Sequence, residues 1–169
     1  ALRAAHPAIE LELVATLTTS DLRRREADIA VRNFQPTEPD FIARKLPERQ
    51  GWMYAAPAYL ERVGPIQTLA DLRRADFFGF GDGALMAKNM ARFGLNVGAE
   101  NFTMTVDNHL VQWELAKAGL GICMMMEEVG DREPAVVRVL PELSPHFPVP
   151  IWLVSHRELR TSRRVRAVF

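Results

Sequence analysis

Two places in the sequence put a histidine close to a group that could take part in catalysis. Ser155 directly precedes His156, and Asp107 lies two residues before His109. A hydrolase needs a nucleophile, a base and an acid that orients the base. Neither pair forms a recognised motif, and neighbouring residues in a strand point to opposite faces, which separates Ser155 from His156. We therefore expect packing or surface roles for both pairs and no catalytic residue.

Metal and thiol chemistry are equally poorly supported. Asp107, His109 and Glu114 are separated by two and five residues, which is no strong metal-ligand pattern. Cys123 is the single cysteine, so an internal disulfide is excluded, and it lies in the apolar run ICMMM. A thiol in such a strand is normally an unreactive core residue, with redox sensing as the alternative. We expect neither a metal nor another cofactor.

Ligand binding is better supported, because three strand-to-helix joints are short and polar. They are residues 18–20, 81–83 and 107–109. In α/β sheets ligands gather at the carboxyl ends of strands, where unpaired N–H groups of helix starts favour anions. The same residue types also cap helices when no ligand is present. Asp82 would repel an anion and would instead select an amine or a hydroxyl group.

The elements that must position these joints alternate along the chain. Period-two or buried apolar runs predict strands, while caps, Pro at helix starts and Gly at helix ends delimit helices. This order indicates an α/β fold with mostly parallel sheets and helices on both faces. The predicted strands are 9–14, 27–31, 41–46, 52–56, 76–80, 102–106, 122–126, 136–140 and 149–155, and the predicted helices are 21–26, 57–64, 68–74, 85–93, 109–119 and one beginning behind Ser162.

Composition limits the partners of the chain. It has 169 residues, 48% of them apolar, and its 21 basic side chains are matched by 21 acidic ones. Nothing in the net charge would hold it on phosphates or on an anionic membrane. No apolar run reaches the roughly 20 residues that a membrane-spanning helix needs, and the opening ALRAAHP has no signal-peptide core. We expect a cytoplasmic protein.

Several segments, in order, resemble the effector-binding domain of LysR-type transcriptional regulators. Together they cover nearly the whole chain, which makes the resemblance far more specific than any one segment. In the first half they are HPAIELEL, DLRRREADIAVR, PDFIARKL and YAAPAYLERVGPIQTLADL, and in the second half LVQWELAKAGLGICMMM, VVRVLPEL and VPIWLVSHRELRTSRRVRAV.

The resemblance implies the fold of type-2 periplasmic binding proteins, with an effector held in the cleft between two lobes. Mapped on this sequence, lobe I takes residues 1–75 plus 150–169 and lobe II takes residues 76–149. Family members normally carry a helix-turn-helix, a linker helix and a strand of lobe I before HPAIELEL. None of these lies within this sequence, so we expect them upstream. The segment DLRRRE is also a turn shorter than its family counterpart.

The resemblance also implies which residues face the effector. It places seven candidates on loops at one cleft, and alternation along the strand after Gly121 leaves one face to border that cleft. The predicted effector contacts are Thr18, Thr19, Phe34, Gly81, Asp82, Asn108, His109 and Met125.

The function that follows is the sensing of a small molecule without turnover. The family pairs its regulatory domains antiparallel, which implies a homodimer or tetramer through DLRRRE and LVQWELAKAG. DNA is contacted only through the helix-turn-helix. One alternative is a solute-binding protein of the same fold, which would carry a signal peptide upstream. The second is a small α/β hydrolase or transferase, which would turn over an ester or acyl substrate.

Overall fold

The chain forms two compact units, each described by itself. The computed structural model describes residues 2–16 and 22–169. Unit 1 comprises Ala1–Glu48 and Val149–Phe169, and unit 2 comprises Arg49–Pro148. From the sequence we expected the first segment of lobe I to reach residue 75, whereas the first segment of unit 1 ends at Glu48. The reason is packing, because Tyr59 and Leu72, which follow the boundary, share one buried cluster with Ile122.

Unit 1 is built on a three-stranded antiparallel sheet. Its order is β1 (Ile29–Arg32), β9 (Trp152–His156) and β2 (Phe41–Lys45), with β9 in the centre. Ser155 of β9 lies opposite Ile29 on one side and Ile42 on the other. The predicted strands 27–31, 41–46 and 149–155 are therefore present, although the last divides into a short strand and β9.

The predicted strand 9–14 is absent from the structure. Residues 9–16 have no regular secondary structure, and the Leu13 side chain is 91% exposed. Alternation tells which face of a strand is apolar, but a strand also needs a neighbour whose N–H and C=O groups pair with its own. Among the described residues no strand pairs with this segment. In the described part of the expected helix DLRRRE, residues 22–25 form a turn and residue 26 a bend.

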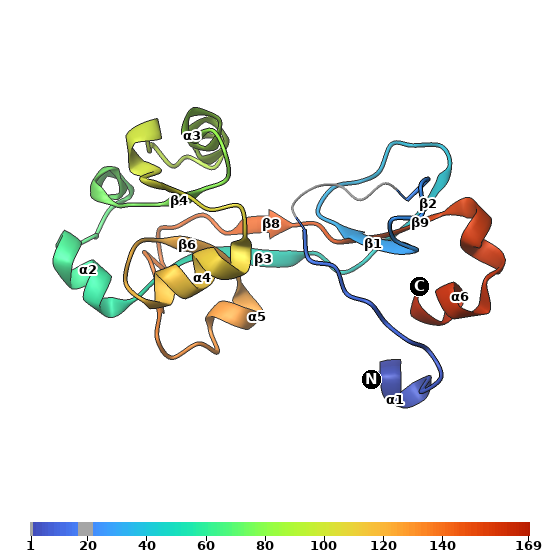
Figure 1. Cartoon of the computed structure of the whole chain (residues 1–169). Coiled ribbons are helices and arrows are strands. Elements are labelled where there is room, and N and C mark those ends of the chain that lie inside the picture. The colour runs from blue at the N-terminus through green and yellow to red at the C-terminus, as the bar shows by residue number, and fades with distance from the viewer. Residues whose placement is uncertain (1, 17–21) are drawn as a thin grey trace. The chain divides into compact units, whose positions relative to one another are not determined.

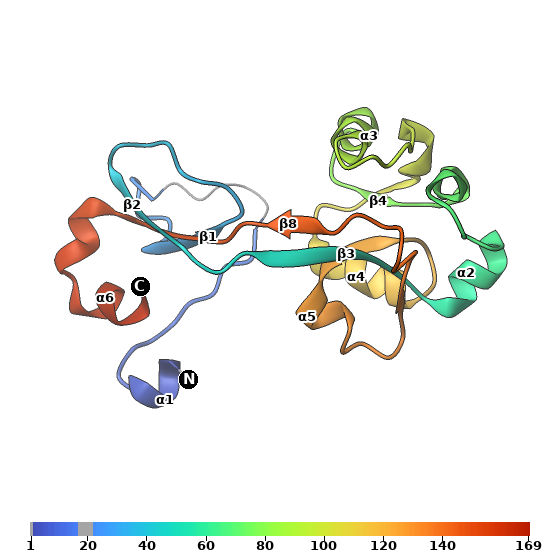
Figure 2. The ribbon, with the colours of Figure 1, turned by 180° about the vertical axis from the view of Figure 1, so that it is seen from behind.

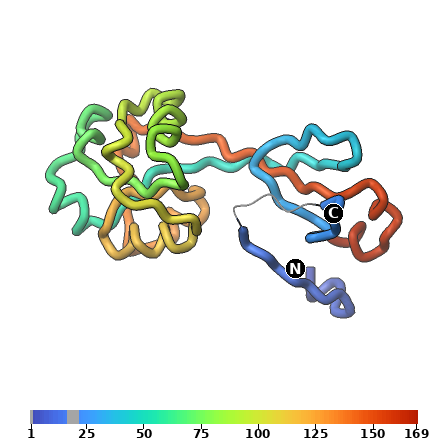
Figure 3. Tube along the Cα trace, turned by 45° about the horizontal axis from the view of Figure 1, so that its top comes forward, coloured from blue at the N-terminus to red at the C-terminus, as the bar shows by residue number. Residues whose placement is uncertain are grey.

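The other elements of unit 1 are short helices. They are α1 (Leu2–Ala5), η3 (Arg157–Thr161) and α6 (Arg163–Val168), where η denotes a 3-10 helix. The Ser162 hydroxyl accepts a bond from Val165 N at 3.5 Å, so Ser162 caps α6 as its sequence position predicts. In Figure 3 the blue and red ends of the tube both belong to unit 1.

Unit 2 contains two groups of strands. The first is centred on β3 (Arg49–Ala55), which pairs antiparallel with β6 (Cys123–Met126) and β7 (Val137–Arg138) and also pairs with β8 (Phe147–Val149). The second consists of β4 (Phe78–Gly79) and β5 (Met104–Thr105), which run parallel. A parallel bridge between Phe77 and Ile122 joins the strand segments before β4 and β6.

The expectation of mostly parallel sheets holds only for part of the fold. The β4–β5 pair and the Phe77–Ile122 bridge are parallel. By contrast, β9 pairs antiparallel with β1 and β2, and β3 pairs antiparallel with β6 and β7. β3 follows the first crossing of the chain between the units and β9 follows the second. Strand–helix alternation along the sequence does not reveal the direction of such strands.

Helices flank the strands of unit 2, and α4 and α5 lie beside β3 and β6 in Figures 1 and 2. Most predicted positions are confirmed, but the segment after Thr68 is a 3-10 helix. The helices are α2 (Pro57–Val63), η1 (Leu69–Arg74), α3 (Gly83–Ala91), η2 (Ala99–Asn101), α4 (His109–Lys117) and α5 (Glu127–Gly130).

A buried asparagine fastens the core of unit 2. Asn101 is 3% exposed, and its Nδ2 donates to the carbonyl oxygens of Leu72, Arg73 and Ala75 at 3.3, 2.9 and 2.7 Å. Its Oδ1 accepts a bond from Gly98 N at 2.9 Å. One side chain thereby bonds to the end of η1 and to the residue before η2. The Asn101 backbone carbonyl also accepts a bond from Phe77 N, next to β4, at 2.7 Å.

Candidate functional site

The candidate site of unit 2 lies at the carboxyl ends of β4 and β5. These strands are parallel neighbours, with Phe78 opposite Met104 and Gly79 opposite Thr105. Each is followed by a short loop and then a helix, residues 80–82 before α3 and residues 106–108 before α4. We call these two segments the paired loops. Because parallel strands end at the same edge, the structure brings four of the predicted contact residues, Gly81, Asp82, Asn108 and His109, to one region.

One buried side chain links the loop after β5 to the end of β4. Gln112 is 2% exposed, and its Nε2 donates to Val106 O at 2.9 Å and to Gly79 O at 3.4 Å. Val106 N also donates to Gly79 O at 3.0 Å. The Thr105 hydroxyl donates to Gly81 O at 3.5 Å. These hydrogen bonds connect the two strand ends and their loops, so the two loop backbones are held next to each other by the protein itself.

Both helix starts are capped by the predicted polar residues. Asp82 Oδ1 accepts a bond from Ala84 N at 2.8 Å, and Asn108 Oδ1 accepts bonds from Leu110 N at 2.9 Å and Val111 N at 3.3 Å. The capping interpretation of these residues is therefore correct. Gly81 has a φ of 66°, in the left-handed region that favours glycine. Its exposed backbone makes the sharp turn that leads into α3.

His109 begins α4 and packs against the loop before α3. Its ring stacks on Phe80, with centroids 6.0 Å apart and an angle of 21° between the planes. Burial lowers the pKa of His109 below its usual value, and contacts with the Gln112 side chain and the Met124 backbone only partly oppose this. Around neutral pH the imidazole is therefore uncharged and offers one donor and one acceptor.

Met125 lies elsewhere in unit 2. It is 7% exposed and packs in a buried cluster with Tyr54, Phe78 and Trp113. The structure thus gives this residue a core position and does not place it on the paired loops. Its neighbour Cys123 belongs to the same cluster, and burial raises the pKa of its thiol to about 12. A thiol with so little thiolate is a poor redox sensor.

The remaining predicted contacts belong to unit 1. Phe34 is 51% exposed and lies beside Arg32, whose guanidinium carbon is 5.6 Å from the Phe34 ring centroid and 5.2 Å from that of Phe41. Arg32 is 6% exposed and lies 3.5 Å from a Glu38 carboxylate oxygen. Thr18 and Thr19 lie outside the described residues.

Ser155 and His156, one of the two histidine pairs considered for catalysis, are not arranged for proton transfer. The Ser155 hydroxyl is buried and donates to Asp28 O at 2.8 Å, away from His156. His156 Nδ1 accepts a bond from Glu158 N at 3.4 Å and caps η3. Within residues 2–16 and 22–169, no group of three or more His, Cys, Asp or Glu side chains is arranged to hold a metal ion.

Three residues at or near the candidate contacts were not foreseen from the sequence, namely Gln112, Phe80 and Arg32. Gln112 left a usable signal, because it precedes Trp113 and lies four residues before Ala116, both buried on α4. A polar side chain on a buried helix face needs a partner. Phe80 and Arg32 gave no comparable signal.

The whole chain matches one family model. The model for the LysR substrate binding domain matches residues 1–169. A search among curated proteins found no match. None of the helices in the described part of the chain has the length and apolarity that crossing a bilayer requires.

Solved structures of LysR-type regulators share the fold. The regulatory domain of CrgA from Neisseria meningitidis has a TM-score of 0.83 at 21% identity, over 99% of this chain and 84% of that one. The effector domain of AmpR from Pseudomonas aeruginosa has a TM-score of 0.73 at 17% identity, covering 99% and 80%. Full-length AphB from Vibrio cholerae has a TM-score of 0.69 at 20% identity, and the chain spans 58% of its length.

Proposed function

This chain belongs to the family of LysR substrate-binding domains, and on that premise we propose that it senses a small-molecule effector for a transcriptional regulator. The observation that carries the proposal is the pair of loops at the ends of β4 and β5. Two capped helix starts, Asp82 and Asn108, lie there on a backbone fixed by Gln112. Such strand ends are where α/β folds bind small molecules.

Binding without turnover is the proposed outcome. The paired loops offer carboxylate, amide and neutral imidazole groups from Asp82, Asn108 and His109, which suit recognition by hydrogen bonds. An effector that prefers one conformation of the domain shifts its population, and no chemical step is needed. Phe34, Thr18, Thr19 and Met125 stay predicted contacts, of which Met125 is supported least because it lies in the core.

The wider assembly is proposed from the family. Full-length CbnR has been solved with its target DNA, and we infer that the whole protein likewise contacts DNA through a helix-turn-helix outside these 169 residues. Pairing of regulatory domains through α4 is consistent with its outer face, where the Leu110 and Val111 side chains are 65% and 46% exposed. An apolar helix face of this kind suits an interface.

The test begins with a thermal-shift screen of metabolites on the 169-residue chain. A compound at one hundred times its dissociation constant stabilises the folded state by about 2.7 kcal/mol, which is readily measured. The affinity of each hit is then compared in Asn108→Asp. Aspartate keeps the cap oxygen, because Asp and Asn cap equally well, but it replaces the free amide donor with a negative oxygen. A leucine would remove the cap as well.

We expect Asn108→Asp to change effector affinity at least tenfold while the unfolding midpoint of the ligand-free chain stays the same. The matched control is Asn89→Asp, which makes the same change at an exposed position of α3 outside the paired loops. A screen without any stabilising compound would count against sensing. An affinity that responds equally to both variants would remove the paired loops from the site.

A further inference from the structure

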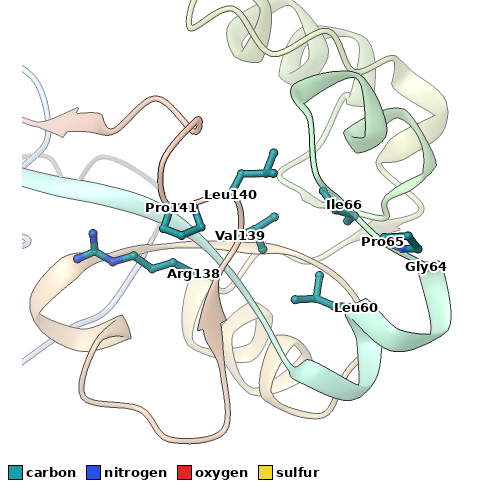
Figure 4. Close-up of a pocket in the computed structure, with 8 residues that line it drawn as sticks. All are labelled: Leu60, Gly64, Pro65, Ile66, Arg138, Val139, Leu140 and Pro141. Atoms are coloured by element: carbon teal, nitrogen blue, oxygen red, sulfur yellow. The ribbon is translucent and has the colours of Figure 1, made fainter.

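Unit 2 contains a pocket of about 260 Å³ that shares no residue with the paired loops. Figure 4 shows it between the end of α2 and the chain that follows β7. Val139 and Leu140 belong to the main buried cluster of unit 2, and Leu60 and Ile66 pack against that cluster. The pocket is therefore an opening onto the core. It is lined by Leu60, Gly64, Pro65, Ile66, Arg138, Val139, Leu140 and Pro141.

The backbone of one wall is held in a conformation that side chains disfavour. Leu140 has a φ of 52°, which costs of order 1–3 kcal/mol for a residue with a Cβ. On the opposite wall Gly64 has a φ of 86°, which glycine adopts without strain. The turn at Leu140 directs its side chain to the pocket, where Figure 4 shows it facing Ile66. Strain of this kind is found where a particular surface shape is maintained.

Three backbone carbonyl groups of the pocket wall already accept hydrogen bonds within the protein. Leu60 O accepts a bond from Gly64 N at 3.1 Å, and Leu140 O accepts bonds from Leu143 N at 3.0 Å and Ser144 N at 2.7 Å. Pro65 O accepts a bond from the Arg74 guanidinium at 2.7 Å. At these three oxygens a polar ligand would compete with bonds that the protein already makes, so it would regain only part of its bonds to water.

Arg138 is the one charged residue of the lining, and its guanidinium is paired with acidic side chains outside the pocket. Its Nε donates to Asp131 at 2.7 Å, its Nη2 pairs with Glu127 at 2.9 Å, and its guanidinium carbon lies 4.2 Å from the Trp52 ring centroid. In Figure 4 the Arg138 side chain extends away from Leu60 and Ile66, with the guanidinium at its far end. With its cation neutralised in this way, the pocket has little to attract an anion.

From these observations we propose that unit 2 has a second binding site, which takes an uncharged apolar molecule of about one ring. The volume is below the roughly 300–1,000 Å³ of pockets for drug-sized ligands, which sets the size. The aliphatic side chains of the lining, together with the three carbonyl groups that are already bonded, favour an apolar ligand. Occupancy extends the core by covering the partly buried Leu60 and Ile66 side chains, so binding stabilises the folded state.

The test uses toluene as the apolar probe and benzoate as its charged counterpart on the full 169-residue chain. Methyl NMR resonances of Leu60, Ile66, Val139 and Leu140 report on the pocket. We expect toluene to shift them saturably below its solubility limit, and benzoate to bind at least tenfold more weakly because its carboxylate would be buried without a partner.

A filled pocket provides the control. Leu60→Phe places a ring in the pocket and should abolish the saturable shifts, while Leu120→Phe makes the same substitution at an exposed site outside the lining and should leave them intact. If Leu60→Phe does not fold, Ile66→Phe fills the opposite side. The proposal is overturned if toluene produces no saturable shift, if the filled variant still binds it, or if benzoate binds as tightly as toluene.

Discussion

Replacing Gln112 by leucine should destabilise the paired loops, because it removes the hydrogen bonds from Gln112 Nε2 to Val106 O and Gly79 O. The side chain is 2% exposed and its bond to Val106 O is 2.9 Å long. Leucine has nearly the same size and helix propensity, so neither volume nor propensity confounds the comparison. Val106 O would lose its partner at a cost of about 1–3 kcal/mol. The extra apolar surface of leucine offsets roughly 1 kcal/mol, so we expect the free energy of unfolding to fall by up to about 2 kcal/mol.

Urea unfolding of the ligand-free chain measures this loss, and hydrogen exchange localises it. The Val106 amide, which bonds to Gly79 O at 3.0 Å, should exchange faster in Gln112→Leu than in the wild type. The matched variant is Gln67→Leu, an exposed position whose free energy of unfolding should stay within about 0.5 kcal/mol of wild type. Equal stabilities for the two variants, with unchanged exchange at Val106, would refute the role given to Gln112.

Two further predictions concern buried polar groups. Asn101→Ala leaves two buried carbonyl oxygens and one part-buried carbonyl oxygen without the Nδ2 donor, and it should lower the free energy of unfolding in urea by about 3 kcal/mol. Asn89→Ala is the exposed control, and a loss below about 1 kcal/mol for Asn101→Ala would contradict the prediction. Burial holds the pKa of His109 below its ordinary value of 6.5, so the unfolded chain binds more protons there and stability should fall as pH drops below about 6.5. Urea titrations from pH 7.5 to 5 should show a steeper decline for wild type than for His109→Gln, and parallel curves would show that His109 does not contribute.

Local rules of sequence predicted the helix starts of the candidate site well. Asp82 and Asn108 cap α3 and α4 because short polar side chains satisfy the first N–H groups of a helix wherever the helix lies. Parallel pairing of β4 and β5 then followed from the strand and helix alternation. These features depend on neighbours within a few residues or on the connection between successive elements.

Features that depend on distant partners were not predictable in the same way. The alternation of Leu11 and Leu13 with polar residues indicated the apolar face of a strand, but it could not show whether another strand pairs with this segment. In the structure both side chains are exposed. Gln112 reaches Gly79, 33 residues away, through a bond that exists only once both loops are in place. Met125 illustrates the remaining difficulty, because alternation separates two faces of β6 without saying which one packs in the core.

The single buried cysteine has a practical consequence for following the effector in solution. With the pKa of its thiol raised to about 12, Cys123 should be almost inert to maleimide dyes at neutral pH, so one engineered surface cysteine can carry a fluorophore without a second labelled position. Asp107→Cys, at an exposed residue beside Asn108, would put such a dye next to the proposed effector site at the paired loops. Labelling of the native cysteine would therefore add little to the fluorescence signal in titrations with the effector.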